Sequence, residues 1–183
     1  FSIVLPIWLL MRNPKERILL MSAATGLVQE FISKVEDCLK GDITWEDGFR
    51  CQFATAFPWM RVAKSSEEKG LNIAGRSGNN PNRSLFPLGI MSSAAGKHPS
   101  IIITDDSSNE QNSETEGQRF KVIDRYSTLS PLAEKIDCPI WNIGTPWHLG
   151  DFSCHVKDEL QMPMFRRHVW GGRPRPVRRG RGR

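Results

Sequence analysis

Two patterns of apolar residues alternate along this chain, and each predicts a different kind of element. Compact apolar runs at residues 17–22 and 100–106 predict strands buried on both faces, as in a parallel sheet. From residue 27 to residue 39 the apolar residues recur with helical spacing, with Thr25 as the expected N-cap and Gly41 at the end. Further strands are predicted at residues 70–75, at 84–92 and, as a second buried strand, at 138–144. The alternation predicts an α/β fold with a mostly parallel sheet flanked by helices.

Three other segments follow less regular patterns. Residues 1–11 are apolar at most positions, which predicts a helix buried on most sides. Residues 107–117 form a predicted polar loop, and residues 118–129 form a predicted helix with Phe120, Ile123 and Leu129 facing inward. The aromatic residues in 42–68 follow no lasting period; stacking on nucleic-acid bases and packing beneath a loop both explain them, and packing is favoured.

The charge is unevenly distributed and suggests two regions. The chain has 183 residues, of which 39% are hydrophobic, enough for one domain with a core at residues 1–160. Eight arginines and no acidic residue lie in residues 166–183, so the net charge of +5 becomes −3 for the rest of the chain. Residues 161–183 are therefore predicted to be a disordered Arg, Gly and Pro-rich tail. Such a tail either binds phosphate backbones or is the accidental product of a shifted reading frame or a damaged prophage gene.

The cysteines and the N-terminal segment exclude several classes of protein. No Cys-x-x-Cys pair is present, and Cys138, His148, Cys154 and His155 match no zinc spacing, so a reducing cytoplasm is expected. The apolar opening is too short to cross a bilayer and lacks the basic leader of a signal peptide, so no membrane association is expected. Because the first residue is Phe1 rather than Met, the chain is expected to be an internal fragment or a truncated product.

The strongest candidate chemistry follows the strand at residues 100–106, which ends in Asp105 and Asp106. Two acids after a buried strand form the Walker B arrangement of P-loop ATPases, where one carboxylate serves Mg²⁺ and the next polarises the attacking water. A solvated turn in a protein that binds no nucleotide is the alternative. The preceding Gly96-Lys97 pair is no P-loop, because Met91 and His98 stand where that pattern needs glycine and Ser or Thr.

A second candidate lies at the end of the next predicted strand, residues 138–144, where Gly144 is followed by Thr145. A right-handed crossover would make this strand the parallel neighbour of the strand that ends in the two acids. The Thr145 hydroxyl would then lie beside the carboxylates, within reach of a γ-phosphate or its water. A strand-ending turn residue is the alternative for Thr145.

The chain resembles the ATPase domain of the large terminase subunit, the DNA-packaging motor of tailed bacteriophages, because several sequence segments occur in the same order. The matching segments are residues 18–24 with the helix that follows, residues 89–90 and 96–98 leading into 101–106, and residues 143–148. The resemblance covers about residues 1–158. It implies a three-layer fold of the P-loop NTPase type, with ATP and Mg²⁺ as cofactors.

The resemblance also implies roles and partners. Asp105 would hold Mg²⁺, Asp106 would orient or deprotonate water, and Gly144 with Thr145 would contact the nucleotide, Thr145 sensing its γ-phosphate. Double-stranded DNA, the portal, the small terminase subunit and a homo-oligomeric ring are the implied partners, in the bacterial cytoplasm at the viral procapsid.

The chain also departs from that family. The family's Walker A loop, expected just before residue 1, and its nuclease domain are both missing, so this chain alone is expected to be a poor ATPase or inactive. Two rival hypotheses remain: a non-enzymatic nucleic-acid-binding remnant acting through the arginine tail, and a helicase-like ATPase.

Overall fold

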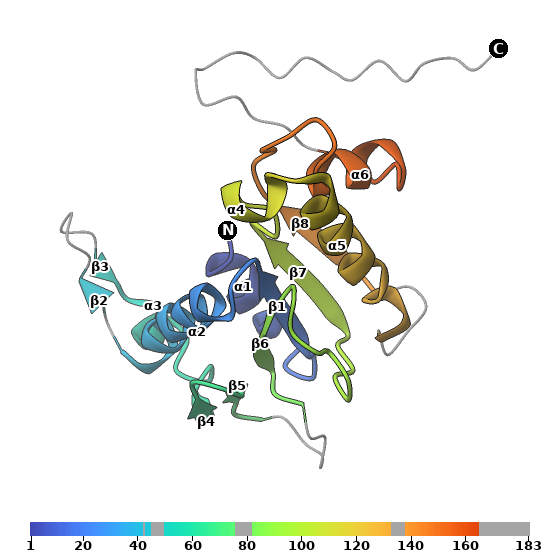
Figure 1. The fold of residues 1–183 in the computed structure, drawn as a ribbon. Helices are drawn as coiled ribbons and strands as arrows, with labels where there is room; N and C mark the ends of the chain where they lie inside the picture. Colours follow the sequence, from blue (N-terminus) through green and yellow to red (C-terminus); the bar gives the residue numbers. More distant parts are fainter. Residues whose placement is uncertain (42, 45–49, 76–81, 133–137, 165–183) are drawn as a thin grey trace.

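The computed structural model describes residues 1–41, 43–44, 50–75, 82–132 and 138–164, and its sheet lies between two layers of helices (Figure 1). The helices are α1 (Val4–Arg12), α2 (Thr25–Lys40), α3 (Phe53–Ala56), α4 (Glu110–Ser113), α5 (Glu116–Ser127), the 3₁₀ helix η1 (Ser130–Leu132) and α6 (Phe152–Asp158). The strands are β1 (Ile18–Ser22), β2 (Ile43–Thr44), β3 (Arg50–Cys51), β4 (Val62–Ser66), β5 (Gly70–Ile73), β6 (Leu85–Gly89), β7 (Ile101–Asp105) and β8 (Ile140–Ile143).

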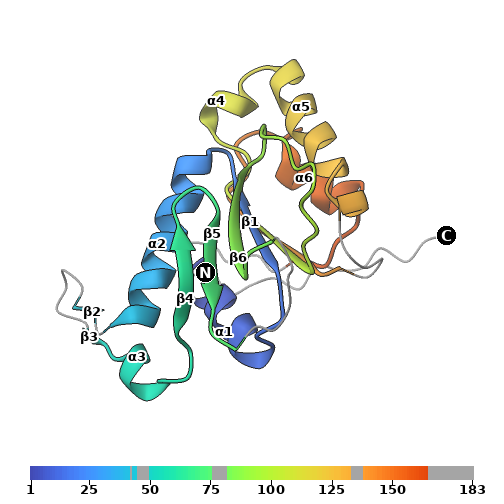
Figure 2. The ribbon, with the colours of Figure 1, turned by 90° about the horizontal axis from the view of Figure 1, so that it is seen from below.

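Six of these strands form one sheet in the order β4-β5-β6-β1-β7-β8, and β2 pairs with β3 separately. The strands β6, β1, β7 and β8 run parallel to one another, whereas β4 and β5 pair antiparallel with each other and β5 pairs antiparallel with β6. Figure 2 shows the β4–β5 hairpin beside β6 and β1, with α2 alongside. The predicted α/β class and the mostly parallel sheet are confirmed.

The core has two parts, one on each face of the sheet. On one face Ile18, Leu20 and Ile103 pack under α1 and α2; on the other, Leu19 and Ile102 pack under α5 and α6. Successive side chains of a strand point to opposite faces, so a strand covered by helices on both sides must be apolar throughout. All five residues of β1 and of β6 are buried for this reason, Ser22 and Gly89 included.

The helix α1 differs from its prediction. It begins at Val4, and its buried residues are Pro6, Ile7 and Leu10, while Val4 and Trp8 are exposed. The prediction of a helix buried on most sides is therefore wrong. One face of α1 packs on the sheet, and Arg12 lies over the exposed ring of Trp8, 4.9 Å from its centroid.

The helix α2 confirms the helical spacing but not its predicted N-cap. It begins at Thr25 after an extended Ala24, without a side-chain cap, and ends at Gly41 as expected. Thr25 therefore lies inside the helix, where its hydroxyl is 3.4 Å from the hydroxyl of Ser92 in the segment after β6. Leu27, the first apolar position of the predicted stripe, is exposed. The buried residues of the stripe are Val28, Ile32, Val35, Cys38 and Leu39.

The predicted polar loop at residues 107–117 contains α4 and the start of α5, so this prediction is wrong in part. Two capping boxes explain the difference: Asn109 exchanges hydrogen bonds with Asn112, and Thr115 does so with Gln118. In α5 the buried residues are Val122 and Tyr126. Phe120, predicted to face inward, is exposed.

The last strand, β8, is confirmed, but it is not buried as predicted. It lies at the edge of the six-stranded sheet, and the side chain of Trp141 is exposed. In the mixed segment 42–68 the structure adds β4, and the rings of Phe53, Phe57 and Trp59 contact one another in series. This contact agrees with packing, although Trp59 itself is exposed.

The predicted tail at residues 161–183 lies, from residue 165 onward, outside the residues that the structure describes. Within the described part, none of the helices combines the length and the apolar character that a bilayer-spanning helix requires.

Candidate active site at the carboxyl edge of the sheet

The carboxyl ends of β7 and β8 bring the predicted site residues together. The strands pair in parallel up to Asp105 opposite Ile143, and the amide of Asp106 then donates to the carbonyl of Ile143 at 3.0 Å. Two residues after Ile143, the amide of Thr145 donates to Oδ1 of Asp106 at 3.2 Å. The acids and the Gly-Thr turn therefore lie at the same edge of neighbouring parallel strands, where ligand sites of α/β proteins form.

Asp106 has a left-handed backbone conformation, and its carboxylate lies beside the turn after β8. Its φ is 43°, in the left-handed region that residues other than glycine and Asn or Asp seldom adopt. Its carbonyl accepts a hydrogen bond from the amide of Ala23, after β1, so the residue is tied to strands on both sides. A side chain added at Gly144 would have its Cβ 3.5 Å from Oδ1 of Asp106, so the turn passes closely beside the carboxylate.

Asp105 has a different environment. Its side chain is about half buried, and its Oδ2 accepts a hydrogen bond from the hydroxyl of Ser2, which precedes α1. Burial raises the pKa of the Asp105 carboxyl; the Ser2 hydrogen bond lowers it, the nearby Asp106 carboxylate raises it, and the net direction is upward. The two adjacent acids thus occupy different surroundings, the first partly buried and the second exposed.

Three serines at this edge were missed by the sequence reasoning: Ser2, Ser22 and Ser107. All three are buried, and the hydroxyls of Ser22 and Ser107 make no hydrogen bond within the described part of the chain. The pairing of Met21 with Thr104 places Ser22 beside Asp105 at the ends of adjacent strands. Ser22 could have been identified as a site residue, because it is a polar residue at the end of a buried strand. Nothing in the sequence indicated that Ser2 would lie at this edge.

The pKa of Asp105 leads to a prediction about stability. At neutral pH the ionised carboxyl should favour the unfolded chain, where its pKa is close to the ordinary value of about 3.9. Asp105→Asn, which can still accept the Ser2 hydrogen bond, should therefore raise the free energy of unfolding at pH 7. The gain should shrink as the pH falls through the raised pKa and vanish below about pH 3.9. Urea unfolding across this range measures it, and a gain independent of pH would contradict the assigned cause.

The donor set at this edge suits a hard cation better than a soft one. Carboxylate and hydroxyl oxygens are typical ligands of Mg²⁺, which in nucleotide sites takes one or two carboxylates and completes its shell with phosphates and waters. Asp105 supplies the carboxylate, and Ser2 and Ser22 supply hydroxyls beside it. Among the described residues, three or more His, Cys, Asp or Glu side chains do not gather anywhere in a metal-binding group.

The loop between β8 and α6 is organised by Asp151 rather than by its histidine and cysteine. The buried Asp151 carboxylate accepts hydrogen bonds from the amides of Trp147, His148 and Cys154, the last of which caps α6. The Nδ1 atom of His148 accepts from the amide of Gly150. These hydrogen bonds order the turn between β8 and α6 and cap the helix. His148 and Cys154 contribute to them.

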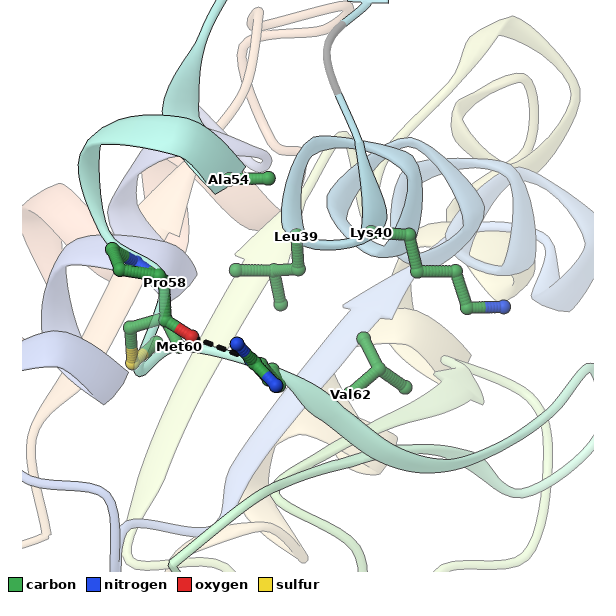
Figure 3. Close-up of a pocket in the computed structure, with 7 residues that line it drawn as sticks. Leu39, Lys40, Ala54, Pro58, Met60 and Val62 are labelled. Carbon is green, nitrogen blue, oxygen red and sulfur yellow. Dashed lines mark hydrogen bonds between the residues drawn. The ribbon is translucent and has the colours of Figure 1, made fainter.

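A cavity of about 370 Å³ lies elsewhere, between the end of α2, α3 and the start of β4 (Figure 3). Its lining includes Leu39, Met60 and Val62, together with two cations, Lys40 and Arg61. Lys40 forms an ion pair with Glu36 of the same helix, and Nε of Arg61 donates to the carbonyl of Pro58 at 2.7 Å. Both cations therefore already contact acceptors of the chain, and the carboxyl edge is the better candidate for chemistry.

No model of a known protein family matches the sequence, and no curated protein matches it significantly. The functional assignment therefore depends on the geometry of the carboxyl edge and on the order of the sequence motifs.

Proposed function

We propose that this chain is part of the ATPase core of a DNA-packaging motor of the large terminase type, with a fold of the P-loop NTPase class. The observation that carries the proposal is the hydrogen bond from the Thr145 amide to the Asp106 carboxylate at the end of two parallel strands. It joins the two motifs that the resemblance to terminases identifies, although 39 residues separate them. A solvated turn after β7 would not require this contact.

The roles follow from the environments of the residues. Asp105, with the Ser2 and Ser22 hydroxyls nearby, would hold Mg²⁺, which supplies positive charge against the phosphate oxygens. Asp106, exposed and fixed by its backbone, would orient the attacking water or accept its proton. The Gly144–Thr145 turn would contact the nucleotide, the Thr145 hydroxyl facing the γ-phosphate.

The intact protein would couple hydrolysis to the movement of double-stranded DNA. In the family that the chain resembles, a Walker A loop binds the β and γ phosphates, so hydrolysis is proposed for the intact protein that carries such a loop. A homo-oligomeric ring in the bacterial cytoplasm, acting with the portal and the small terminase subunit at the procapsid, completes the proposal.

Thr145→Val tests the proposed role of the Thr145 hydroxyl at the γ-phosphate, because valine keeps the backbone amide that contacts Asp106 and removes the hydroxyl alone. In the full-length protein the rate of DNA packaging should fall roughly 10 to 100-fold, the effect of losing one hydrogen bond to a charged group. Packaging of DNA into procapsids and ATP hydrolysis would be measured together.

Thr128→Val is the matched control, since Thr128 ends α5 and its hydroxyl bonds only to the carbonyl of Arg125 among the described contacts. Normal packaging by Thr145→Val, or an equal defect in Thr128→Val, would contradict the assigned role.

A second candidate function is nucleic-acid binding through the tail, favoured by the eight arginines without an acid in residues 166–183. Deleting residues 166–183 should then weaken binding to duplex DNA and flatten its dependence on salt, because fewer counterions are released when fewer phosphates are contacted. Fluorescence anisotropy at several salt concentrations measures both quantities. Unchanged affinity after the deletion would reject the tail as the binding element.

A further inference from the structure

Asn142, in β8, forms a side-chain bridge behind the candidate site. Its Oδ1 accepts a hydrogen bond from the Thr104 hydroxyl of β7 at 2.8 Å, and its Nδ2 donates to the Tyr126 hydroxyl of α5 at 3.0 Å. Nδ2 also lies 3.3 Å from the sulfur of Met162, after α6. Because both ends of the amide are engaged, the orientation of this side chain is fixed by two neighbouring elements.

The bridge lies immediately before the site on both strands. Thr104 pairs with Asn142 in the register of β7 and β8, and Asp105 and Ile143 follow as the next pair. Beyond that pair come the contacts of the site itself, from the Asp106 amide to Ile143 and from the Thr145 amide to Asp106. Among the side-chain contacts of the described residues, the bridge is therefore the nearest link between β7 and β8 ahead of the site.

The edge position of β8 makes such a link important. An edge strand is held by backbone hydrogen bonds on one side, and the side chains of β8 are at most partly buried. Thr104 and Tyr126 are both buried, so their hydroxyls would lose hydrogen-bond partners if β8 moved. This cost opposes sliding of β8 along β7.

We propose that Asn142 is a positioning residue for the site, which holds the Thr145 amide against the Asp106 carboxylate and connects that contact to α5. The inference rests on the proposed function for its catalytic meaning. Removing the bridge should weaken the hydrogen bond from the Thr145 amide to Asp106. It should leave the pairing of β7 and β8 at the opposite end of the strands unchanged. In the full-length protein it should lower kcat for ATP hydrolysis more than it changes KM.

The test measures hydrogen exchange of backbone amides by NMR in the 183-residue chain. The isosteric Thr104→Val should accelerate exchange at Thr145 about tenfold, the effect of losing one hydrogen bond, and Asn142→Ala, which removes two, should accelerate it at least as much. The amide of Ile102, which donates to the carbonyl of Pro139 at the other end of the pairing, should keep its protection. Ser127→Ala is the control, because it removes an α5 hydroxyl that bonds to Ile123 and does not touch the bridge.

Two outcomes would overturn the inference. Unchanged exchange at Thr145 in both variants would show that the bridge does not hold the contact. Equal acceleration at Thr145 and at Ile102 would show a general loss of stability instead of positioning. Failure of the full-length protein to hydrolyse ATP would reject the proposed function, whereas the exchange measurement would still decide whether Asn142 holds the turn.

Discussion

Asp106→Asn in the full-length protein should reduce the rate of ATP hydrolysis at least about 100-fold, because general acid and base groups contribute roughly 10²–10⁴ to enzymatic rates. The asparagine retains an oxygen that can accept the hydrogen bond from the Thr145 amide, so the turn after β8 should remain in place. Asp105→Ala should abolish hydrolysis as well, through loss of the proposed Mg²⁺ ligand. Steady-state hydrolysis and circular dichroism would be measured on the same preparations.

The matched control is Asp124→Asn, which makes the same chemical change on the exposed face of α5. It should leave hydrolysis unchanged. Normal turnover in both site variants would end the assignment of the acids to the chemistry, and a defect in all three variants would point to a general loss of folded protein.

Gly70→Ala should be the most destabilising small substitution among the described glycines. Gly70 has a φ of 83°, and a Cβ there would lie 2.0 Å from the carbonyl oxygen of Leu85 and 2.8 Å from Cα of Phe86. Both atoms belong to the backbone of β6, which cannot move without disturbing the sheet. The left-handed conformation alone costs about 1–2 kcal/mol for alanine, and the overlap should bring the loss to roughly 3–5 kcal/mol.

Gly75→Ala separates the two contributions, because Gly75 has nearly the same φ, 82°, with no atom within 4 Å of its added Cβ. It should lose about 1–2 kcal/mol, the conformational part alone. Urea denaturation of both variants measures the difference. Equal losses would show that β5 does not approach β6 as closely as the structure places it.

The parts of the fold that could be predicted are those fixed by local sequence. β7 could be identified because three consecutive isoleucines suit a strand buried on both faces, and the helix α2 because its apolar stripe is regular. The proximity of Thr145 to the acids followed from these local predictions and the right-handed crossover rule.

The features that were missed depend on how distant segments pack. The burial of β8 depends on whether the strand lies in the centre of the sheet or at its edge. The residues of a strand do not by themselves indicate its position in the sheet. The contact between Ser2 and Asp105 joins residues 103 positions apart, so no local pattern marks it. The helix α4 was not predicted because its polar residues resemble those of a loop. Asn109 and Asn112 nevertheless form a capping box that provides hydrogen bonds for its first turn.

The most direct measurement of the central proposal is a crystal structure of the full-length protein with Mn²⁺ in place of Mg²⁺ and a non-hydrolysable ATP analogue. The anomalous signal of the metal should lie beside the Asp105 carboxylate, with the terminal phosphate next to Asp106 and the Gly144–Thr145 turn. A nucleotide bound elsewhere, such as in the cavity lined by Leu39 and Arg61, or a metal remote from Asp105, would contradict the proposal.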